Sequence, residues 1–349
     1  YQILMIIGVD IRCLMSPRYT GVSWYTLNLL ENIFKLDSSN EYRLFYNSSK
    51  KMALPEFNYP NVKYFGFKYP NKILNLFLNF FSWPKIDLMI GKADILIAPN
   101  LHFMAWSKNC KKIMVVHDLS FLRFKEFFNL KMRLWHRLIL RKNILNQTDM
   151  IVADSSSTKR DLIELLKIQE KNITTIHPGV SPDFRVIPKE ELSEVKKKYN
   201  LPDKFVLSLG TLEPRKNILS VIQACSHPLI IVGPCGWKNN LIKKENVRFL
   251  GYVEEKDKPY IYNLASVFVY PSYYEGFGLP LLEAMACDTP VIAGLNSSQG
   301  EVVGQAGIMV DPYNLNEIRQ AIEAILNSGR LRENLVQSGL ARVKEFSWE

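Results

Sequence analysis

Two glutamates eight residues apart mark the stretch 269–285 as a candidate site for chemistry. Glu275 opens the glycine-bearing loop Glu275–Gly278, and Glu283 follows in a helix that we expect to start at Pro280, since proline in a first helical turn loses no hydrogen bond. Glycine lets backbone N–H groups approach a ligand closely, and a helix N-terminus favours negative charge. The pattern therefore suits a ligand with phosphates and sugar hydroxyls. An ordinary turn with two solvated glutamates is the alternative.

A pair of cations lies upstream of that stretch. Arg215 and Lys216 belong to residues 210–217, GTLEPRKN, directly after the apolar run Phe205–Leu209. A guanidinium offers a planar fork of donors and an ammonium a compact charge, which are two complementary ways to hold a diphosphate. In isolation both would be ordinary surface charges. Residues 249–253, FLGYV, form a strand end whose backbone could pair with a base edge, so Val253 is a further candidate binding residue.

Apolar runs that alternate with helical segments must position these residues. Candidate strands lie at residues 3–9, 42–46, 92–99, 112–117, 150–153 and 172–176, and then at 205–209, 230–233, 247–250, 267–270, 291–293 and 308–310. Continuous apolar runs are typical of strands buried on both faces, so we expect an α/β protein with parallel sheets. The pattern restarts after a polar, proline-bracketed segment, which predicts two domains, 1–180 and 181–349. Such sheets bind ligands at the carboxyl ends of their strands.

In this order the motifs resemble the retaining glycosyltransferases of the GT-B fold, specifically glycosyltransferase family 4. The family pattern is GT…xRKN…LGYV…PSxxEGFGLPxxEAMAxGxPV, and residues 210–291 follow it closely. Matches in the first half are Gly8–Arg12, Thr20–Val22, Val116–Asp118 and Pro178–Val180. Within the family the chain looks most like bacterial mannosyl- or rhamnosyltransferases that build surface polysaccharide. The resemblance implies two Rossmann-like domains that face each other across a cleft, the first for the acceptor and the second for the nucleotide-sugar donor.

The resemblance also implies roles by position. Arg215 and Lys216 would neutralise the donor diphosphate and the charge on the leaving nucleoside diphosphate, which is larger in the transition state than in the ground state. Glu283 would accept hydrogen bonds from the ribose, and Glu275 would hold the transferred sugar. The other implied donor contacts are Val253, the backbone of Gly276, Phe277, Gly278 and Leu279, and Gly21 on a loop of the first domain.

His117 would lie near the anomeric carbon of the sugar and is, with Glu275, a candidate catalytic residue. A lone histidine after a buried strand is also commonly structural. Asp118 could orient His117 or cap the turn that follows. We expect the remaining histidines to be structural, namely His102, His136, His177 and His227.

The sequence contains no Asp-x-Asp motif and no metal-ligand spacing. Glycosyltransferases that hold a divalent ion at the diphosphate usually carry paired aspartates, and here Arg215 and Lys216 would supply the positive charge. We therefore expect no metal and no other cofactor. The resemblance implies retention of anomeric configuration by front-face attack, in which the departing phosphate helps to deprotonate the acceptor hydroxyl. A double displacement between Glu275 and Glu283 is disfavoured, because the resemblance places Glu283 at the ribose.

Three departures from the family pattern leave the main donor motif unchanged. Asp288 stands where glycine is common, Ser266 stands where aspartate is usual, and residues 297–301, SSQGE, replace a common SSLPE. The last segment lies near the sugar pocket in the family, so the identity of the sugar stays open. The chain ends soon after Phe346, and we expect that the family's final helix, which crosses back onto the first domain, is missing.

Composition and charge narrow the class of protein. At 47% hydrophobic and 22% charged residues the chain is a folded globular protein. Five scattered cysteines without a CxxC pattern are typical of reduced cytosolic thiols. The net charge of +10 arises in the first half of the chain. Residues 1–190 contain 27 basic and 16 acidic residues, whereas the remainder contains 17 basic and 18 acidic residues. A basic first half suggests an anionic partner.

Two basic aromatic segments carry much of that charge. Residues 72–85 and 121–142 interleave Phe, Leu and Trp with lysine and arginine, including Arg133, Arg137 and Arg141. A basic amphipathic helix with aromatic residues on its apolar side is typical of a segment in a membrane interface. Core-facing helices with solvated basic faces are the alternative. Nucleic-acid binding is disfavoured, because no recognition motif is present.

The leading hypothesis is a retaining, metal-independent transferase that moves a hexose, with mannose favoured, from a nucleoside-diphosphate sugar to a glycan or lipid-linked glycan. GDP-mannose is the favoured donor, and UDP- or dTDP-sugars are alternatives. We expect a cytoplasmic protein, peripheral at the inner face of the cytoplasmic membrane and active in surface polysaccharide synthesis. The alternative functions are a GT-B sugar-nucleotide epimerase and a non-catalytic nucleotide-sugar-binding protein.

Overall fold

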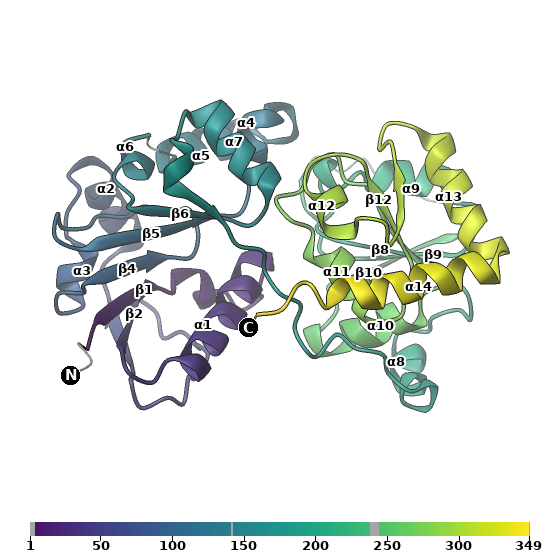
Figure 1. The fold of residues 1–349 in the computed structure, drawn as a ribbon, viewed down its shortest axis with the longest axis horizontal. Helices are drawn as coiled ribbons and strands as arrows, with labels where there is room; N and C mark the ends of the chain where they lie inside the picture. The colour runs from purple at the N-terminus through teal and green to yellow at the C-terminus, as the bar shows by residue number, and fades with distance from the viewer. Residues whose placement is uncertain (1–3, 141, 238–243, 349) are drawn as a thin grey trace. The chain divides into compact units, whose positions relative to one another are not determined.

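The computed structural model of the protein describes residues 4–140, 142–237 and 244–348. The chain divides into two compact units, each with its own parallel sheet (Figure 1). Unit 1 contains the chain up to Ile176 together with Trp348, and unit 2 contains His177–Ser347. The sequence pattern predicts the boundary after residue 180, and the structure divides the chain at Ile176.

The sheet of unit 1 has seven parallel strands in the order β3-β2-β1-β4-β5-β6-β7. They are β1 (Ile6–Asp10), β2 (Glu41–Asn47), β3 (Val62–Phe67), β4 (Ile95–Ala98), β5 (Lys111–Val116), β6 (Met150–Ala153) and β7 (Ile173–Thr175). The sequence analysis missed β3. This strand lies at the edge of the sheet and none of its residues is fully buried, so it lacks the continuous apolar run that identifies the inner strands.

Helices lie in four of the six connections between these strands, and the β2–β3 and β4–β5 connections, both within the described residues, contain none. The helices are α1 (Gly21–Leu36), α2 (Asn71–Phe80), α3 (Ile86–Met89), α4 (Ser120–Arg123), α5 (Leu130–Ile139), α6 (Lys142–Asn146) and α7 (Ser156–Leu166). Residues 121–142 do not form one helix, because the chain turns between α4 and α5. Asn129 marks the new start, since its side chain accepts a hydrogen bond from the backbone N of Met132 and so caps α5.

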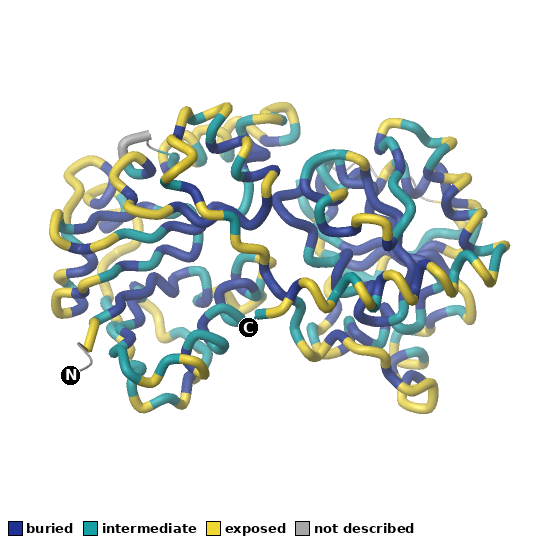
Figure 2. The backbone as a smooth tube through the Cα atoms, viewed as in Figure 1, coloured by how far each residue is buried: buried dark blue, intermediate teal, exposed yellow. Residues whose placement is uncertain are grey.

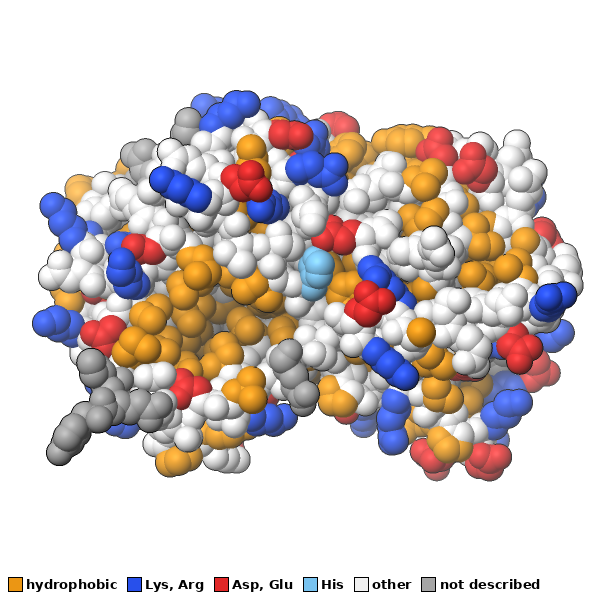
Figure 3. Space-filling model, in the orientation of Figure 1, with side chains coloured by type: hydrophobic (Ala, Val, Ile, Leu, Met, Phe, Trp, Pro, Cys, Tyr) orange, Lys and Arg blue, Asp and Glu red, His pale blue; other side chains and the backbone are white. Residues whose placement is uncertain are grey.

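One face of the unit 1 sheet is only partly covered. Ile95, Ile97 and Ile113 on this face are half-buried. Figure 3 shows apolar side chains gathered on the viewed side of unit 1, over β1, β4 and α1. The ring of Trp348 packs at this face, with its centroid 5.5 Å from that of Tyr25 in α1.

The sheet of unit 2 has six parallel strands in the order β10-β9-β8-β11-β12-β13. They are β8 (Val206–Leu209), β9 (Leu229–Val232), β10 (Val247–Gly251), β11 (Val267–Tyr270), β12 (Val291–Gly294) and β13 (Ile308–Val310). Every residue of the four inner strands is buried (Figure 2), as the apolar runs predict for strands covered on both faces.

The helices of unit 2 cover both faces of this sheet. They are α8 (Ser193–Lys198), α9 (Ile218–Ala224), α10 (Lys258–Leu264), α11 (Leu279–Ala286), α12 (Gln299–Val303), α13 (Leu315–Asn327) and α14 (Gly329–Val343). Two separate apolar clusters fill the spaces on either side: one contains Leu281 and Met285 of α11, and the other contains Ile318 and Ile322 of α13. The sheet is therefore packed on both faces, and the loops at its edge start from buried strands.

Candidate functional site

The candidate site of unit 2 lies where the strand order reverses. β8 pairs with β9 on one side and with β11 on the other. Connections that leave such neighbouring strands pass to opposite faces of the sheet and open a crevice between them. A short 3-10 helix, η5 (Pro214–Lys216), follows β8, and the loop 271–278 follows β11. The fold thereby brings the predicted cations and Glu275 to one edge of the sheet.

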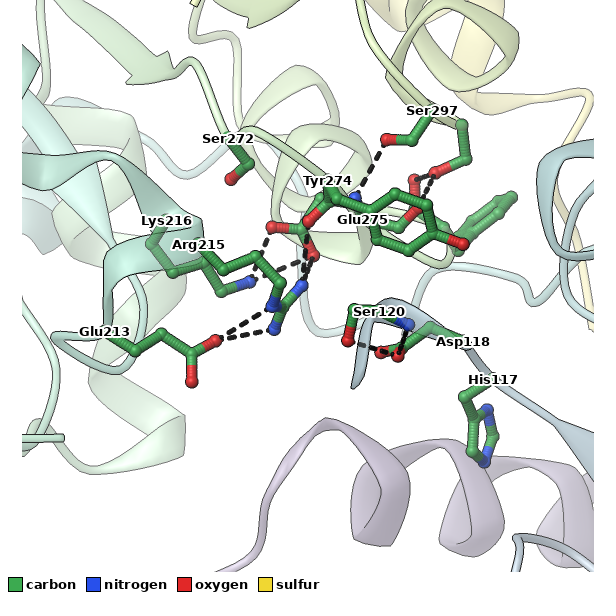
Figure 4. A network of polar contacts seen from close by, with 12 residues as sticks. His117, Asp118, Ser120, Glu213, Arg215, Lys216, Ser272, Tyr274, Glu275 and Ser297 are labelled. Carbon is green, nitrogen blue, oxygen red and sulfur yellow. Dashed lines mark hydrogen bonds and ion pairs between the residues drawn. The ribbon is translucent and has the colours of Figure 1, made fainter. Parts of the chain in front are cut away.

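Glu275 receives hydrogen bonds from both cations (Figure 4). Nη1 of Arg215 lies 2.8 Å from Oε2 of Glu275, and Nζ of Lys216 lies 2.8 Å from Oε1 and 3.0 Å from Oε2. The side chains of Arg215, Lys216 and Glu275 are exposed by only 15%, 12% and 7%. Hydrogen bonds between ionised groups are stronger in such a setting than in water. The three residues thus form one buried ion cluster.

Two further side chains complete the cluster. Glu213 accepts hydrogen bonds from Nε and Nη2 of Arg215 at 3.0 and 2.7 Å, so two carboxylates balance two cations. The hydroxyl of Tyr270, at the end of β11, is hydrogen-bonded to Nζ of Lys216, which also lies 4.8 Å from the centre of the tyrosine ring. The sequence analysis gave neither residue a role. A glutamate two positions before an arginine is the signal that could have identified Glu213.

The cluster sets the protonation of Glu275. Burial by itself would raise the pKa of Glu275, but the charges of Arg215 and Lys216 outweigh burial and lower the pKa to about 2. Burial also lowers the pKa of Lys216, against the attraction of Glu275. Glu275 is therefore ionised across the neutral range. In that state it accepts hydrogen bonds and has no proton to donate.

Two serines hold the loop that follows Glu275. Oγ of Ser297 accepts a hydrogen bond from the backbone N of Glu275 at 2.8 Å. Oγ of Ser298 lies 2.9 and 2.7 Å from the carbonyl oxygens of Glu275 and Phe277. Gly278 then adopts a φ of 110°, which residues with a side chain rarely reach, and α11 begins. Both serines are shared by SSQGE and the common SSLPE, so the side chains that hold this loop follow the family pattern, and the departure is confined to Gln299 and Gly300.

His177 also contacts this loop, although the sequence analysis treated it as structural. Its ring stacks on that of Phe277 at 5.7 Å between centroids, and its Nε2 lies 2.7 Å from Oε1 of Glu301. Both partners are remote in sequence, and an isolated histidine carries no local signal of them.

Glu283 lies in a second polar group on α11. Its Oε2 accepts a hydrogen bond from the hydroxyl of Tyr262 at 3.0 Å. Burial raises the pKa of Glu283 to about 7, and the charge of Glu255 adds to this effect, whereas the charge of Lys258 opposes it. Its charge therefore changes near neutral pH, unlike that of Glu275. Val253, the remaining candidate of this unit, follows β10 and is buried.

His117 follows β5 in unit 1 and is bound through both ring nitrogens. Nδ1 lies 2.6 Å from Oδ2 of Asp154, and Nε2 lies 2.8 Å from the carbonyl oxygen of Pro99. A carboxylate and a carbonyl both accept hydrogen bonds, so the ring can donate to both only when each nitrogen carries a hydrogen, and this arrangement favours the cationic form of the ring. Burial would lower the pKa of His117, but the charge of Asp154 and its hydrogen bond outweigh burial and raise it.

Asp118 does not orient His117. Of the two roles considered for Asp118, the structure supports the second, a cap on the turn that follows. Its Oδ1 accepts hydrogen bonds from the backbone N and Oγ of Ser120 at 2.9 and 2.6 Å, at the start of α4. The orienting carboxylate is Asp154, which follows β6. Asp154 comes 37 positions after His117, so only the pairing of β5 with β6 brings the two together.

The other predicted residues of unit 1 lie on helices. Gly21 is the exposed first residue of α1, and no atom lies within 4 Å of the position that a Cβ would take there. Arg133 and Arg137 are exposed on α5. Arg141 lies outside the described residues.

The described part of the chain contains neither a metal-binding cluster nor a membrane-spanning helix. In residues 4–140, 142–237 and 244–348, no three His, Cys, Asp or Glu side chains are grouped so that they could hold a metal ion. Across the same described ranges, no helix is both long and apolar enough to cross a bilayer.

The chain matches two family models. Residues 19–184 match the model described as Glycosyltransferase Family 4, and residues 189–342 match the model described as Glycosyl transferases group 1. The chain is also similar to two mannosyltransferases of Escherichia coli. It is 34% identical to O-antigen chain mannosyltransferase B over 257 residues, which cover 68% of this chain and 67% of the relative. It is 32% identical to the serotype-specific mannosyltransferase WbdA, over 68% of this chain but only 32% of that relative.

Solved structures agree on the fold. Sucrose-phosphate synthase from Thermosynechococcus elongatus superposes with a TM-score of 0.77 at 22% identity, covering 99% of this chain and 95% of the other. WaaG, a glycosyltransferase involved in lipopolysaccharide biosynthesis, superposes with a TM-score of 0.71 at 14% identity, covering 97% and 95%. With two parallel-sheet domains, two matching family models and a relative at 34% identity, the chain belongs to glycosyltransferase family 4 and has the GT-B fold.

Proposed function

We propose that the protein transfers mannose from a nucleoside-diphosphate sugar, with GDP-mannose as the favoured donor, to a glycan or lipid-linked glycan acceptor. The observation that carries this proposal is the cluster of Arg215 and Lys216 with Glu275, beside a glycine loop and the N-terminus of α11. Two cations beside the positive end of a helix suit a diphosphate, and an ionised carboxylate suits sugar hydroxyls. The named mannosyltransferase relatives support mannose as the sugar.

The proposed chemistry follows from the charges of the cluster. Charge on the leaving diphosphate is larger in the transition state than in the ground state, so Arg215 and Lys216 would lower the barrier as well as bind the donor. Glu275, ionised and held by two cations, would position the sugar. We propose that transfer proceeds without a metal and with retention of configuration, the departing phosphate taking the proton of the acceptor hydroxyl. His117, whose cationic form is favoured by Asp154, would act near the anomeric carbon.

Donor binding is tested by a thermal-shift screen with GDP-, UDP- and dTDP-sugars, because a ligand that binds the folded state raises its melting temperature. Transfer is then measured with the stabilising donor and a mannose-containing glycan. The variant Lys216→Ala should lose about a hundredfold in kcat/KM, whereas Lys197→Ala, an exposed lysine on α8, should keep the wild-type value. NMR of the product reports the anomeric configuration, and EDTA should leave the rate unchanged.

Other outcomes would favour other functions. Donor binding without transfer to any glycan indicates a nucleotide-sugar-binding protein. Conversion of the nucleotide sugar in the absence of an acceptor indicates an epimerase. A loss of rate in EDTA that magnesium restores contradicts metal independence.

We also propose that the protein acts in the cytoplasm as a peripheral protein at an anionic membrane surface, to which α5 contributes. Leu130 and Leu134, one helical turn apart, are exposed by 79% and 60%. Lys131, Arg133 and Arg137 are exposed on the same short helix. A helix with exposed leucines and basic residues suits the headgroup region of anionic lipid. If charge reversal at Arg133 and Arg137 leaves vesicle binding unchanged, α5 has no part in it.

A further inference from the structure

Helix α2 and the turn after it expose a large apolar surface. Ile73, Leu76 and Phe80 of the helix are exposed by 54%, 49% and 58%, and Phe81 and Trp83 of the turn by 67% and 60%. The inner side of the helix packs against the rest of unit 1, since Leu74 and Leu78 are buried. The outer side of the helix is nevertheless apolar and exposed, which the packing of Leu74 and Leu78 does not explain.

The exposed aromatic side chains form one patch. The ring of Phe77 lies 5.2 Å from that of Phe81 and 6.0 Å from that of Trp83, measured between centroids. Single exposed hydrophobic residues are normal on a protein surface, whereas a contiguous apolar patch marks an interaction site. We call the outer side chains of residues 71–85 the α2 surface.

The charged residues that neighbour α2 in the sequence are lysines, apart from one buried acid. Between residues 68 and 92 the chain carries the lysines Lys68, Lys72, Lys85 and Lys92. The single acidic residue between residues 68 and 92 is Asp87. It is buried and accepts hydrogen bonds from the backbone N and Oγ of Ser107. An apolar, aromatic surface bordered by lysines thus faces solvent.

We propose that the α2 surface docks on an anionic lipid bilayer, with the aromatic side chains in the interface and the lysines at the lipid phosphates. Amphipathic helices bind such interfaces through buried apolar area together with attraction between basic residues and anionic lipids. A second copy of this chain is disfavoured as the occupant, because a symmetric contact would oppose lysine with lysine. The inference extends the peripheral location proposed above to a second helix. In Figure 1, α2, α6 and α5 follow one another along one margin of unit 1.

The test is co-sedimentation of the full chain with vesicles of phosphatidylcholine alone and of phosphatidylcholine with phosphatidylglycerol. The wild type should sediment with the anionic vesicles and be released by salt. The variant Phe81→Ser with Trp83→Ser should bind at least about tenfold more weakly. Lys72→Gln with Lys85→Gln should lose about fivefold for each lysine.

Matched controls keep the readout specific. Leu36→Ser removes an apolar residue that is 74% exposed at the end of α1, and Lys171→Gln with Lys189→Gln removes two exposed lysines elsewhere. Both controls should sediment as the wild type does. Donor-induced thermal stabilisation of every variant reports that the chain is folded, and transfer to a soluble glycan reports the proposed reaction separately from lipid binding.

Three results would overturn the proposal: no sedimentation of the wild type with anionic vesicles, equal binding by the variants and the wild type, or equal binding to neutral and anionic vesicles. Self-association that the Phe81 and Trp83 substitutions abolish, with no vesicle binding, would instead assign the α2 surface to a second copy of the chain. Because vesicle binding needs no donor, a failure here leaves the proposed transfer reaction standing.

Discussion

Nζ of Lys216 lies 2.8 Å from Oε1 of Glu275, so a cation proposed to bind the donor diphosphate already holds the carboxylate proposed to bind the sugar. With Arg215 on the other oxygen and Glu213 behind it, the site carries balanced charge. A donor diphosphate would therefore enter a site whose cations are already fixed in place.

Glu275→Gln should destabilise the folded chain by about 3 kcal/mol, because it leaves two little-exposed cations with a single carboxylate. Chemical denaturation measures the change in the free energy of unfolding. Glu254→Gln is the control, since Glu254 is 51% exposed in its ion pair with Lys198 and such pairs contribute little. A nucleoside diphosphate should stabilise Glu275→Gln more than the wild type, because it supplies the missing anion. An equal stabilisation would show that the diphosphate does not contact the cations.

Donor affinity should rise with pH through the pKa of Glu283, which is about 7. The carboxylate accepts hydrogen bonds from the ribose hydroxyls better than the neutral acid does, so the deprotonated form binds more tightly. Between about pH 6 and about pH 8 the ionised fraction, and with it the affinity for the nucleoside diphosphate, should increase about tenfold. Calorimetry measures this increase. Glu283→Gln should flatten the profile, and a rise that persists in that variant would assign the titration to another group.

Asp154→Asn should lower the pKa of His117. The wild-type pKa is raised by the charge of Asp154 against the effect of burial, and asparagine keeps a hydrogen-bond acceptor but removes the charge. NMR of the imidazole nitrogens follows the titration, and His136, whose pKa is lowered by burial, is the control that should not change. An unchanged pKa of His117 would show that Asp154 does not set its charge.

The same pair should make stability depend on pH. A histidine whose pKa is raised on folding contributes stability that is complete below its unfolded pKa of about 6.5 and is lost as the pH rises through the folded pKa. The difference in the free energy of unfolding between the wild type and Asp154→Asn should therefore shrink with rising pH.

Gly278→Ala should destabilise the loop before α11 by about 1–2 kcal/mol, because its φ of 110° disfavours any side chain. Gly329→Ala is the control: this glycine begins α14, and no atom lies within 4 Å of an added Cβ. That control should be neutral or slightly stabilising. Thermal melting and donor binding measure both variants, and equal melting temperatures would contradict the strain argument.

Much of the fold follows from local sequence. The run of residues 205–209 predicts β8 because a strand buried on both faces must be apolar throughout. The edge strand β3 was missed for the same reason, since three of its six residues are exposed and its pattern is mixed. Residues 121–142 were expected as one amphipathic segment, and the cap at Asn129, a local signal, divides it.

The sequence by itself determined which residues could form the site. Arg215, Lys216 and Glu275 stand in the segments that follow apolar runs, and parallel strands present such segments at one edge of a sheet. Only the tertiary structure decided how these residues pair. Glu275 and Lys216 are 59 positions apart, and His117 and Asp154 are 37 apart. Such contacts depend on which strands lie side by side and on the charges that burial brings together, and a local pattern of residues encodes neither.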